Sequence, residues 1–600
     1  MPADDTSRPR HPYQDSGLDP DRRVEDLLSR LELADKAGLM FHSGIPLWFK
    51  SDAGMAKVLA GFPTPDELVR GKRMNHFTLQ GSGSPREMAQ WHNDMQQRAE
   101  QTPLGIPLTF STDPRNAFSD NPATSLMAGA FSQWPETTGL AAIGSEDLVE
   151  RHADMARQEY LAVGIRVALH PQIDLATEPR WCRINGTFGA DADLTSRLVR
   201  AYIRGFQKDT LGPASVATMT KHFPGGGPQK DGEDPHFDHG REQIYPGGAF
   251  DYHLAPFRAA LEAGTTQIMP YYGMPVGTEY EEVGFGFNKG ILTGLLRERL
   301  GFDGIVCTDF GLLNDMELFG DHYPARAWGV EHMSVPERAA KIIDAGADQF
   351  GGEHCPDVVV DLVRSGRISE ARLDESVRRI LKEKFQLGLF DSRYVDVETA
   401  VRTVGRADFA AAGAAAQRAA MTLLTNGHEP AEPLLPLTPG RKVFVQGVNP
   451  EQAARYATVV ATPAEADVAI VRLQAPFEAR SRAFEDIFHA GRLWFTEHEL
   501  APVLEICRQV PTVVDIYLDR PAVVPELATE AVALIADFGA DDQAVLAVLF
   551  GEAEPKGSLP FELPSSEKAV LNQPTDLPHA SADPLFPFGH GLRYSRTTDA

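Results

Sequence analysis

Residues 301–311 read Gly-Phe-Asp-Gly-Ile-Val-Cys-Thr-Asp-Phe-Gly and are the most informative part of the chain. Three apolar residues in the middle predict a short buried strand, and the carboxylate of Asp309 follows at its carboxyl end. The stretch 216–227 repeats this arrangement, because a Val-Ala-Thr-Met-Thr run leads into Lys221, His222 and a glycine-rich loop. Barrel enzymes hold their catalytic groups at the carboxyl ends of their strands. The sequence therefore predicts one pocket that contains both strand ends.

Short β-branched runs alternate with helical patterns through the first two thirds of the chain. This alternation predicts parallel strands joined by helical crossovers, and a (β/α)8-type barrel is the simplest closed form. A chain of 600 residues is too long for a single hydrophobic core. We therefore predict an α/β protein with a flexible N-terminal arm (1–20), a catalytic barrel (21–390), a linker (391–439) and an α/β sandwich domain (440–600) whose C-terminal tail packs back on the body.

The charge balance argues against two classes of partner. The chain carries 84 Asp and Glu against 57 Lys and Arg, a net charge of −27, and has no long basic run that could neutralise phosphates or bind anionic lipid. We expect neither nucleic acid nor a membrane as a partner. The N-terminus lacks an apolar signal segment, and no apolar run approaches the roughly 18 residues of a membrane span, so we expect a cytoplasmic protein.

The cysteines and histidines give no sign of a metal site. Four cysteines lie far apart in the sequence, at Cys182, Cys307, Cys355 and Cys507. These spacings fit neither a disulfide framework nor a zinc knuckle. His236 and His239 share one loop, but no third ligand follows at a telling spacing. We predict no metal and no cofactor, and the sequence leaves the oligomeric state open, a homo-oligomer included.

A set of short motifs occurs in an order that is more specific than any one of them. They are Gly105-Ile106-Pro107-Leu108 with Thr112-Asp113, Glu178-Pro179-Arg180-Trp181-Cys182-Arg183, Lys221-His222-Phe223, Thr308-Asp309-Phe310, Leu434-Leu435-Pro436-Leu437, Gly557-Ser558-Leu559-Pro560 and Phe588-Gly589-His590-Gly591-Leu592. In this order they resemble glycoside hydrolase family 3, in which a barrel is followed by an α/β sandwich and the active site lies between the two.

The resemblance implies roles for five residues at the predicted strand ends. Asp309 would be the nucleophile that forms a covalent glycosyl-enzyme intermediate, and Asp113, Arg183, Lys221 and His222 would hold the hydroxyls of the terminal sugar. A cation within ~4–6 Å lowers a carboxylate pKa, so Lys221 or Arg183 could also keep the nucleophile ionised. Taken alone, Asp309 could equally cap a helix at a strand-to-helix turn.

The family often has an aromatic residue near the nucleophile, and here this position falls on a doubled tyrosine. We assign it to Tyr271 and keep Tyr272 as the rival. The general acid is a glutamate on a loop of the second domain in many two-domain members. We choose Glu478, which follows a β-run, and keep Glu485 as a competitor because the family's usual surroundings of this glutamate are absent.

A different acid lies in the loop after the lysine and histidine. Asp234-Pro235-His236 resembles the Asp-x-His dyad of single-domain members that cleave N-acetylglucosaminides, in which an imidazole serves as general acid or base. This alternative would make the protein an N-acetyl-β-glucosaminidase or a glycoside phosphorylase.

The hypothesis that follows is a retaining, exo-acting β-glycosidase, above all a β-glucosidase, that removes terminal sugars from oligosaccharides or small-molecule glycosides. A retaining enzyme needs two carboxyl groups about 5–5.5 Å apart, one to attack the anomeric carbon and one to protonate the departing oxygen. A non-catalytic carbohydrate-binding protein on the same frame is the third alternative, and the intact carboxylate of Asp309 argues against it.

Overall fold

The computed structural model describes residues 11–47, 62–119, 129–318, 320–427 and 432–594. Its first domain is a closed barrel whose eight strands are all parallel to their neighbours, in the order β1-β12-β9-β7-β5-β4-β3-β2. The barrel strands are β1 (Phe41–Pro46), β2 (His76–Gln80), β3 (Thr109–Thr112), β4 (Ile165–Ala168), β5 (Ala217–Phe223), β7 (Gln267–Pro270), β9 (Ile305–Phe310) and β12 (Gln349–Gly351). The predicted fold class is thereby confirmed.

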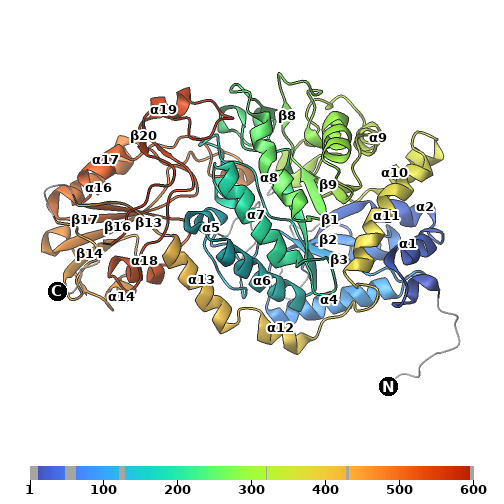
Figure 1. The fold of residues 1–600 in the computed structure, drawn as a ribbon, viewed down its shortest axis with the longest axis horizontal. Helices are drawn as coiled ribbons and strands as arrows, with labels where there is room; N and C mark the ends of the chain where they lie inside the picture. The colour runs from blue at the N-terminus through green and yellow to red at the C-terminus, as the bar shows by residue number, and fades with distance from the viewer. Residues whose placement is uncertain (1–10, 48–61, 120–128, 319, 428–431, 595–600) are drawn as a thin grey trace.

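Helices surround the barrel, as Figure 1 shows. They are α1 (Pro20–Leu28), α2 (Leu33–Leu39), α4 (Pro85–Glu100), α5 (Thr137–Ile143), α6 (Glu146–Ala162), α7 (Ala192–Gln207), α8 (Phe250–Glu262), η7 (Gly290–Arg299), α9 (Val335–Ala345), α10 (Pro356–Arg364) and α11 (Glu370–Gln386). Their ends follow ordinary capping chemistry. In α4, Ser84 accepts a hydrogen bond from the Glu87 backbone N–H, and the Glu87 side chain accepts one from the Ser84 backbone N–H.

The second domain is a six-stranded sheet with the order β13-β18-β17-β16-β14-β15, in which only β13 runs antiparallel to its neighbour. Its strands are β13 (Thr422–Asn426), β14 (Lys442–Gln446), β15 (Thr458–Val459), β16 (Val468–Gln474), β17 (Thr512–Tyr517) and β18 (Ala533–Asp537). Its helices are α14 (Pro450–Ala453), α15 (Ala483–Asp486), α16 (Glu497–Gln509), α17 (Pro525–Glu530) and α18 (Asp542–Leu549).

Both faces of this sheet are buried. Val468 and Ile470 of β16 pack in one apolar cluster with α18, whereas Ala469 and Val471 belong to the other cluster, which includes residues of α16 and α17. Successive side chains of a strand point to opposite faces, so this division places helices on both sides of the sheet. The second domain is therefore an α/β sandwich, as predicted.

The two domains are joined by helices α12 (Val397–Thr403) and α13 (Ala407–Ala420), which run beneath the barrel in Figure 1. These helices, together with strand β13, occupy most of the segment predicted as a linker (391–439). The second sheet thus begins before residue 440, because β13 closes it at the β18 edge. The sequence analysis missed this strand because it follows directly on an alanine-rich helix.

The start of the described chain is also more ordered than the predicted arm (1–20). Tyr13 is buried, its hydroxyl donates to the Leu104 carbonyl oxygen at 3.1 Å, and its carbonyl accepts from Arg23. The segment from residue 11 to α1 therefore packs on the barrel, since one aromatic side chain anchors it. Residues 1–10 lie outside the described residues.

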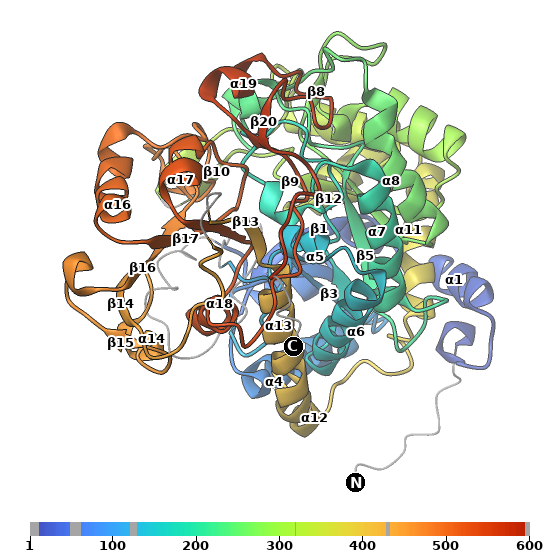
Figure 2. The same ribbon diagram turned by 60° about the vertical axis from the view of Figure 1, so that its left-hand side comes forward.

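The C-terminal tail crosses back to the barrel, as the views in Figures 1 and 2 agree. It contains β19 (Leu563–Pro564), α19 (Glu567–Asn572) and β20 (Pro584–Phe586). The Asp576 carboxylate accepts from the backbone N–H groups of Gly247 and Ala249, and the Thr575 carbonyl accepts from the Thr177 hydroxyl at 2.7 Å. The tail therefore holds two loops at the carboxyl ends of the barrel strands. Within the described ranges, none of the helices has the length and apolar character of a membrane span.

Candidate active site

Five of the predicted site residues lie at or beyond the carboxyl ends of four barrel strands, β3, β4, β5 and β9. Asp309 lies near the end of β9, Lys221 and His222 lie in β5, and Asp113 follows β3 directly. Arg183 lies on the long segment after β4. Parallel strands in a barrel end at the same face, so residues far apart in the sequence meet there.

Lys221 and Asp113 form one half of this site. The Lys221 ammonium donates to Asp113 Oδ1 at 2.8 Å, and the lysine side chain is only 6% exposed while the aspartate is 23% exposed. The aspartate thus keeps an accessible oxygen beside a fixed positive charge. Such a pair can accept and donate hydrogen bonds at the same time, which is what adjacent sugar hydroxyls require.

Arg183, His222 and Asp174 form the other half. His222 Nδ1 lies 2.7 Å from Asp174 Oδ2, and His222 Nε2 lies 3.0 Å from an Arg183 Nη1 donor. Burial lowers the pKa of His222 far below its usual range, and the charge of Arg183 lowers it further. Burial lowers the pKa of Arg183. The neighbouring acidic groups, which include Asp309 and Asp174, outweigh this effect and raise the pKa above its usual value. The pair therefore consists of a neutral imidazole and a charged guanidinium.

Asp309 has one carboxylate oxygen that is held and one that is not. Oδ1 accepts from the Phe310 backbone N–H at 2.8 Å. Oδ2 is buried, has no hydrogen-bond partner among the described residues and lies 3.9 Å from His222 Nε2. A buried carboxylate oxygen without a hydrogen-bond donor is costly, and such groups concentrate at functional sites. Asp309 therefore keeps Oδ2 unpaired beside His222 and does not cap a helix.

The two tyrosines after β7 have different partners. The Tyr271 hydroxyl donates to Asp234 Oδ2 at 2.8 Å, and its ring packs on the His222 ring with centroids 4.4 Å apart. The Tyr272 hydroxyl donates to the Phe310 carbonyl at 2.8 Å and accepts from the Phe310 N–H at 3.0 Å. Burial, and next the Asp309 carboxylate, raise the pKa of Tyr272 well above its usual value. Tyr272, the rival, is therefore the tyrosine that holds the backbone beside Asp309, while Tyr271 forms a wall of the site.

The Asp234 and His236 pair exists in the structure. Asp234 Oδ1 lies 2.6 Å from His236 Nδ1, and Asp234 Oδ2 accepts from Tyr271 and from the Trp181 indole at 2.9 Å. Burial opposes ionisation of Asp234, but the interactions with His236 and the charge of Arg183 hold the pKa of Asp234 below its usual range. Burial lowers the pKa of His236, and the contact with Asp234 opposes this shift. The dyad is thus anchored to the same wall as His222.

The two candidate acids of the second domain differ in their environment. Glu485 lies in α15, and its carboxylate is 3.4 Å from His239 Nε2, so it is engaged with the barrel loop. Glu478 is exposed, and its carboxylate forms no hydrogen bond or ion pair within the described part of the chain. Its loop is nevertheless held in place, because the Glu478 N–H donates to the Ala490 carbonyl at 2.9 Å. Of the two candidates, Glu478 is therefore the one whose carboxylate is not engaged by another described side chain.

Arg520 joins this acidic loop to the barrel and is one of the residues that sequence reasoning missed. It is fully buried and donates to the Pro476 carbonyl, to the Gly491 carbonyl and, across the domain boundary, to the Arg180 carbonyl at 2.8 Å. Arg180 lies three residues before Arg183. The second domain is therefore fixed to the barrel segment that carries a site residue.

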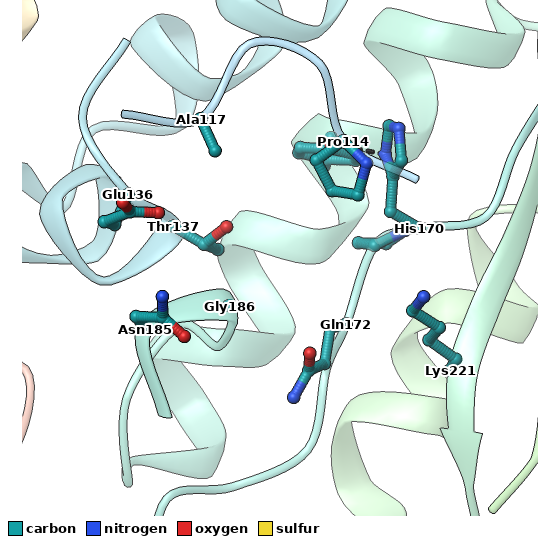
Figure 3. Close-up of a pocket in the computed structure, with 11 residues that line it drawn as sticks. Pro114, Ala117, Glu136, Thr137, His170, Gln172, Asn185, Gly186 and Lys221 are labelled. Atoms are coloured by element: carbon teal, nitrogen blue, oxygen red, sulfur yellow. Dashed lines mark hydrogen bonds between the residues drawn. The ribbon is translucent and has the colours of Figure 1, made fainter. Parts of the chain in front are cut away.

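A small cavity of about 30 Å³ lies beside Lys221 and is shown in Figure 3. Gln172 and Thr137 line it together with Asn185, whereas Asp309 does not. Glu136 lies at its edge, 2% exposed, and accepts from the Ser119 N–H at 2.6 Å and from the hydroxyl of Tyr517 in the second domain at 3.3 Å. The cavity has room for about two water molecules or a group of similar size.

Asp174 is the second residue that sequence reasoning missed, although it lies at the centre of the polar network. It stands in Pro171-Gln172-Ile173-Asp174-Leu175, six residues beyond the end of β4, and no motif pointed to it. A usable signal was present, because an aspartate between two aliphatic residues needs a buried partner.

Metal ligation has no structural support in the described part of the chain. Within it, no three His, Cys, Asp or Glu side chains are grouped so that they could hold a metal ion. All four cysteines are free, and Cys182 and Cys307 are buried.

Comparisons with known proteins agree with this geometry. Residues 74–382 match the model of the glycosyl hydrolase family 3 N-terminal domain, and residues 392–594 match that of the C-terminal domain. The chain is 51% identical over 588 residues to beta-glucosidase C of Emericella nidulans, covering 97% of this chain and 94% of that protein. It is 42% identical over 612 residues to a periplasmic beta-glucosidase/beta-xylosidase of Dickeya chrysanthemi, covering 97% and 91%.

A solved structure shows the same fold at lower identity. The beta-glucosidase from Listeria innocua in complex with glucose superimposes with a TM-score of 0.75 at 22% identity, covering 96% of this chain and 83% of that one. The matches of both domain models, in the predicted order, confirm the resemblance. The chain belongs to glycosyl hydrolase family 3.

Proposed function

We propose that this protein is a retaining, exo-acting β-glucosidase. The observation that carries the proposal is the free, buried Oδ2 of Asp309 beside Arg183 and His222. Relatives at about half identity over nearly the whole chain are named beta-glucosidases, which supports glucose as the terminal sugar.

The proposed reaction has two displacement steps. In the first, Asp309 Oδ2 forms a bond to the anomeric carbon, the glycosidic bond breaks, and the leaving oxygen takes a proton from Glu478. In the second, Glu478 takes a proton from water, the water oxygen bonds to the anomeric carbon, and Asp309 is released. Two inversions give net retention of configuration.

The other polar residues bind the sugar in this proposal. Lys221 and Asp113 hold one edge of the ring through its hydroxyls, and Arg183 donates to another.

Replacement of Asp309 tests the nucleophile. We expect Asp309→Gly to lose at least about 10,000-fold in kcat on an aryl β-glucoside, and to form an α-glucosyl azide when azide replaces the missing carboxylate. Wild-type protein should gain the mass of one 2-fluoroglucosyl group from a 2-deoxy-2-fluoroglucoside. Full activity of Asp309→Gly would end the proposal, and a pure binding protein would gain no mass.

The choice of acid is tested by comparing two variants. If Glu478 is the acid, Glu478→Gln should lose activity on glucosides with poor leaving groups but keep it on dinitrophenyl glucoside, which needs no proton. Glu485→Gln tests the competing glutamate in α15 in the same way, and it should leave both activities unchanged if Glu478 is the acid. The opposite result, selective loss in His236→Ala, would favour the N-acetylglucosaminidase or phosphorylase alternative, which the formed Asp234 and His236 pair keeps open.

A cytoplasmic location is the last part of the proposal. One relative is named periplasmic, so the location of this protein needs its own measurement. Fractionation of the native cells with an antibody to the chain decides it, and recovery outside the cytoplasmic fraction would contradict the proposal.

A further inference from the structure

Asp174 is a fully buried carboxylate whose two oxygens have separate partners. Oδ2 faces His222 Nδ1 at 2.7 Å. Oδ1 accepts from two backbone N–H groups, that of Gly226 at 2.5 Å and that of His222 at 3.2 Å. Burial raises the pKa of Asp174 to about 6, and the bond from Gly226 and the charge of Arg183 oppose this rise. Two of its three printed contacts are thus backbone N–H donors, and the third is the His222 ring nitrogen.

The contact of His222 with Arg183 determines which imidazole nitrogen carries the proton. A guanidinium can only donate, so His222 Nε2, 3.0 Å from Arg183 Nη1, must accept. In a neutral imidazole the proton is then on Nδ1 and points at Asp174. The direction of donation runs from Arg183 to His222 and from His222 to Asp174.

This direction bears on the nucleophile, because Nε2 also lies 3.9 Å from Asp309 Oδ2. When His222 Nε2 carries no proton, the Arg183 guanidinium can approach the imidazole and remain beside Asp309. Arg183 Nε is buried and has no partner among the described residues, so this donor stays available to a substrate oxygen. A proton on Nε2 would instead repel the guanidinium from this place.

We propose that Asp174 is a positioning residue for the glucosidase reaction, fixing His222 in the Nδ1-protonated tautomer and thereby holding Arg183 beside Asp309. The inference rests on the proposed function of the same site. Asp174 touches neither substrate nor reacting atoms in this role and acts through the imidazole.

Asparagine is the sharpest substitution, because it has the size of aspartate but only one accepting oxygen. If its amide NH2 faces His222 Nδ1, the imidazole must move its proton to Nε2, against the guanidinium. If the NH2 faces Gly226 instead, two donors oppose each other in the loop. A wrong tautomer has reduced catalysis by up to about 10,000-fold in an aspartate-histidine pair of a different enzyme class.

A double-mutant cycle separates the tautomer role from a role in holding the loop. Activity on an aryl β-glucoside is measured for Asp174→Asn, His222→Ala and the double variant. We expect Asp174→Asn to lose at least about 100-fold in kcat with a smaller change in KM, but to lose less than about threefold when His222 is already alanine. Asp541→Asn is the control, since Asp541 caps α18 in the second domain and asparagine caps equally well.

The outcomes are distinct. An equal loss in both backgrounds, or an Asp174→Asn variant that does not fold in either, would show that the carboxylate only anchors the loop at Gly226 and would overturn the inference. Labelling by a 2-deoxy-2-fluoroglucoside separates this from the proposed function. Wild-type protein that takes no label refutes the proposed function, whereas labelling of Asp174→Asn at the wild-type rate refutes only the role of Asp174.

Discussion

Replacing Glu136 with glutamine should stabilise the protein at alkaline pH and have little effect near pH 4. Glu136 is buried where the barrel meets the second domain, and its Oε1 accepts from Ser119 and from Tyr517. Burial raises the pKa of this carboxyl group to about 7 from 4.5. A glutamine carbonyl can accept the same two hydrogen bonds without carrying a charge.

The magnitude follows from the two pKa values. Below about pH 4.5 the carboxyl group is protonated in both the folded and the unfolded chain, so pH has no effect through this group. Between pH 4.5 and 7 the folded chain holds a proton that the unfolded chain releases, and stability falls as pH rises. Above pH 7 the folded state carries the full penalty of a buried charge, about 3 kcal/mol.

Urea denaturation of wild-type and Glu136→Gln protein between pH 4 and 9 measures this difference. We expect the variant to gain up to about 3 kcal/mol at pH 9 and less than about 0.5 kcal/mol at pH 4. Glu146→Gln is the matched control, because Glu146 forms an exposed ion pair with Arg197 and such pairs contribute about 0–1 kcal/mol. A difference between variant and wild type that does not change with pH would refute the reasoning.

Three further substitutions test the site and its support. Arg520→Met removes the hydrogen-bond donors that join the second domain to the barrel. We expect kcat on glucosides with poor leaving groups to fall by up to about 100-fold, with little change in the stability of the barrel. A wild-type kcat would contradict this. Gly227→Ala would place a methyl group 1.7 Å from the Leu175 carbonyl oxygen and should lower the free energy of unfolding by at least about 2 kcal/mol. Gly294 has open space around it, so Gly294→Ala should change the free energy of unfolding by less than about 1 kcal/mol in the same denaturation assay. Lys221→Met should reduce kcat/KM on aryl glucosides by about 10- to 100-fold, because a charged hydrogen bond to the sugar is lost, and an unchanged value would exclude this lysine from the sugar site.

The sequence predicted the parts of the site that stand at strand ends. Asp309 and Lys221 each follow a short apolar run, and such runs fix where a strand stops and therefore where its last side chains gather. The roles of Arg183 and Asp113 came from the motif order of the family resemblance, since Arg183 lies far beyond the end of β4 and Asp113 follows a strand of only four residues. All four residues lie at one face of the barrel because its strands are parallel and end there.

Other parts depended on contacts that no local pattern encodes. Strands β1 and β2 were not recognised from an apolar pattern, because each contains a buried histidine, His42 and His76. Asp174 and Arg520 act through backbone groups that lie far away in the sequence. Asp174 binds the N–H of Gly226, 52 residues away, and Arg520 binds the carbonyl of Arg180, 340 residues away. The distinction between Tyr271 and Tyr272 likewise required the hydroxyl partners, because adjacent residues have the same sequence context.

The contact of the tail with the barrel has a consequence for protein synthesis. Thr575 and Asp576 hold the loops at Thr177, Gly247 and Ala249, yet these residues leave the ribosome only when the chain is almost complete. Domains fold in order as they emerge from the ribosome. The barrel therefore lacks the contacts of Thr575 and Asp576 with its two loops while some 180 further residues are translated. A nascent chain stalled before residue 573 should therefore contain a formed barrel that does not yet turn over substrate.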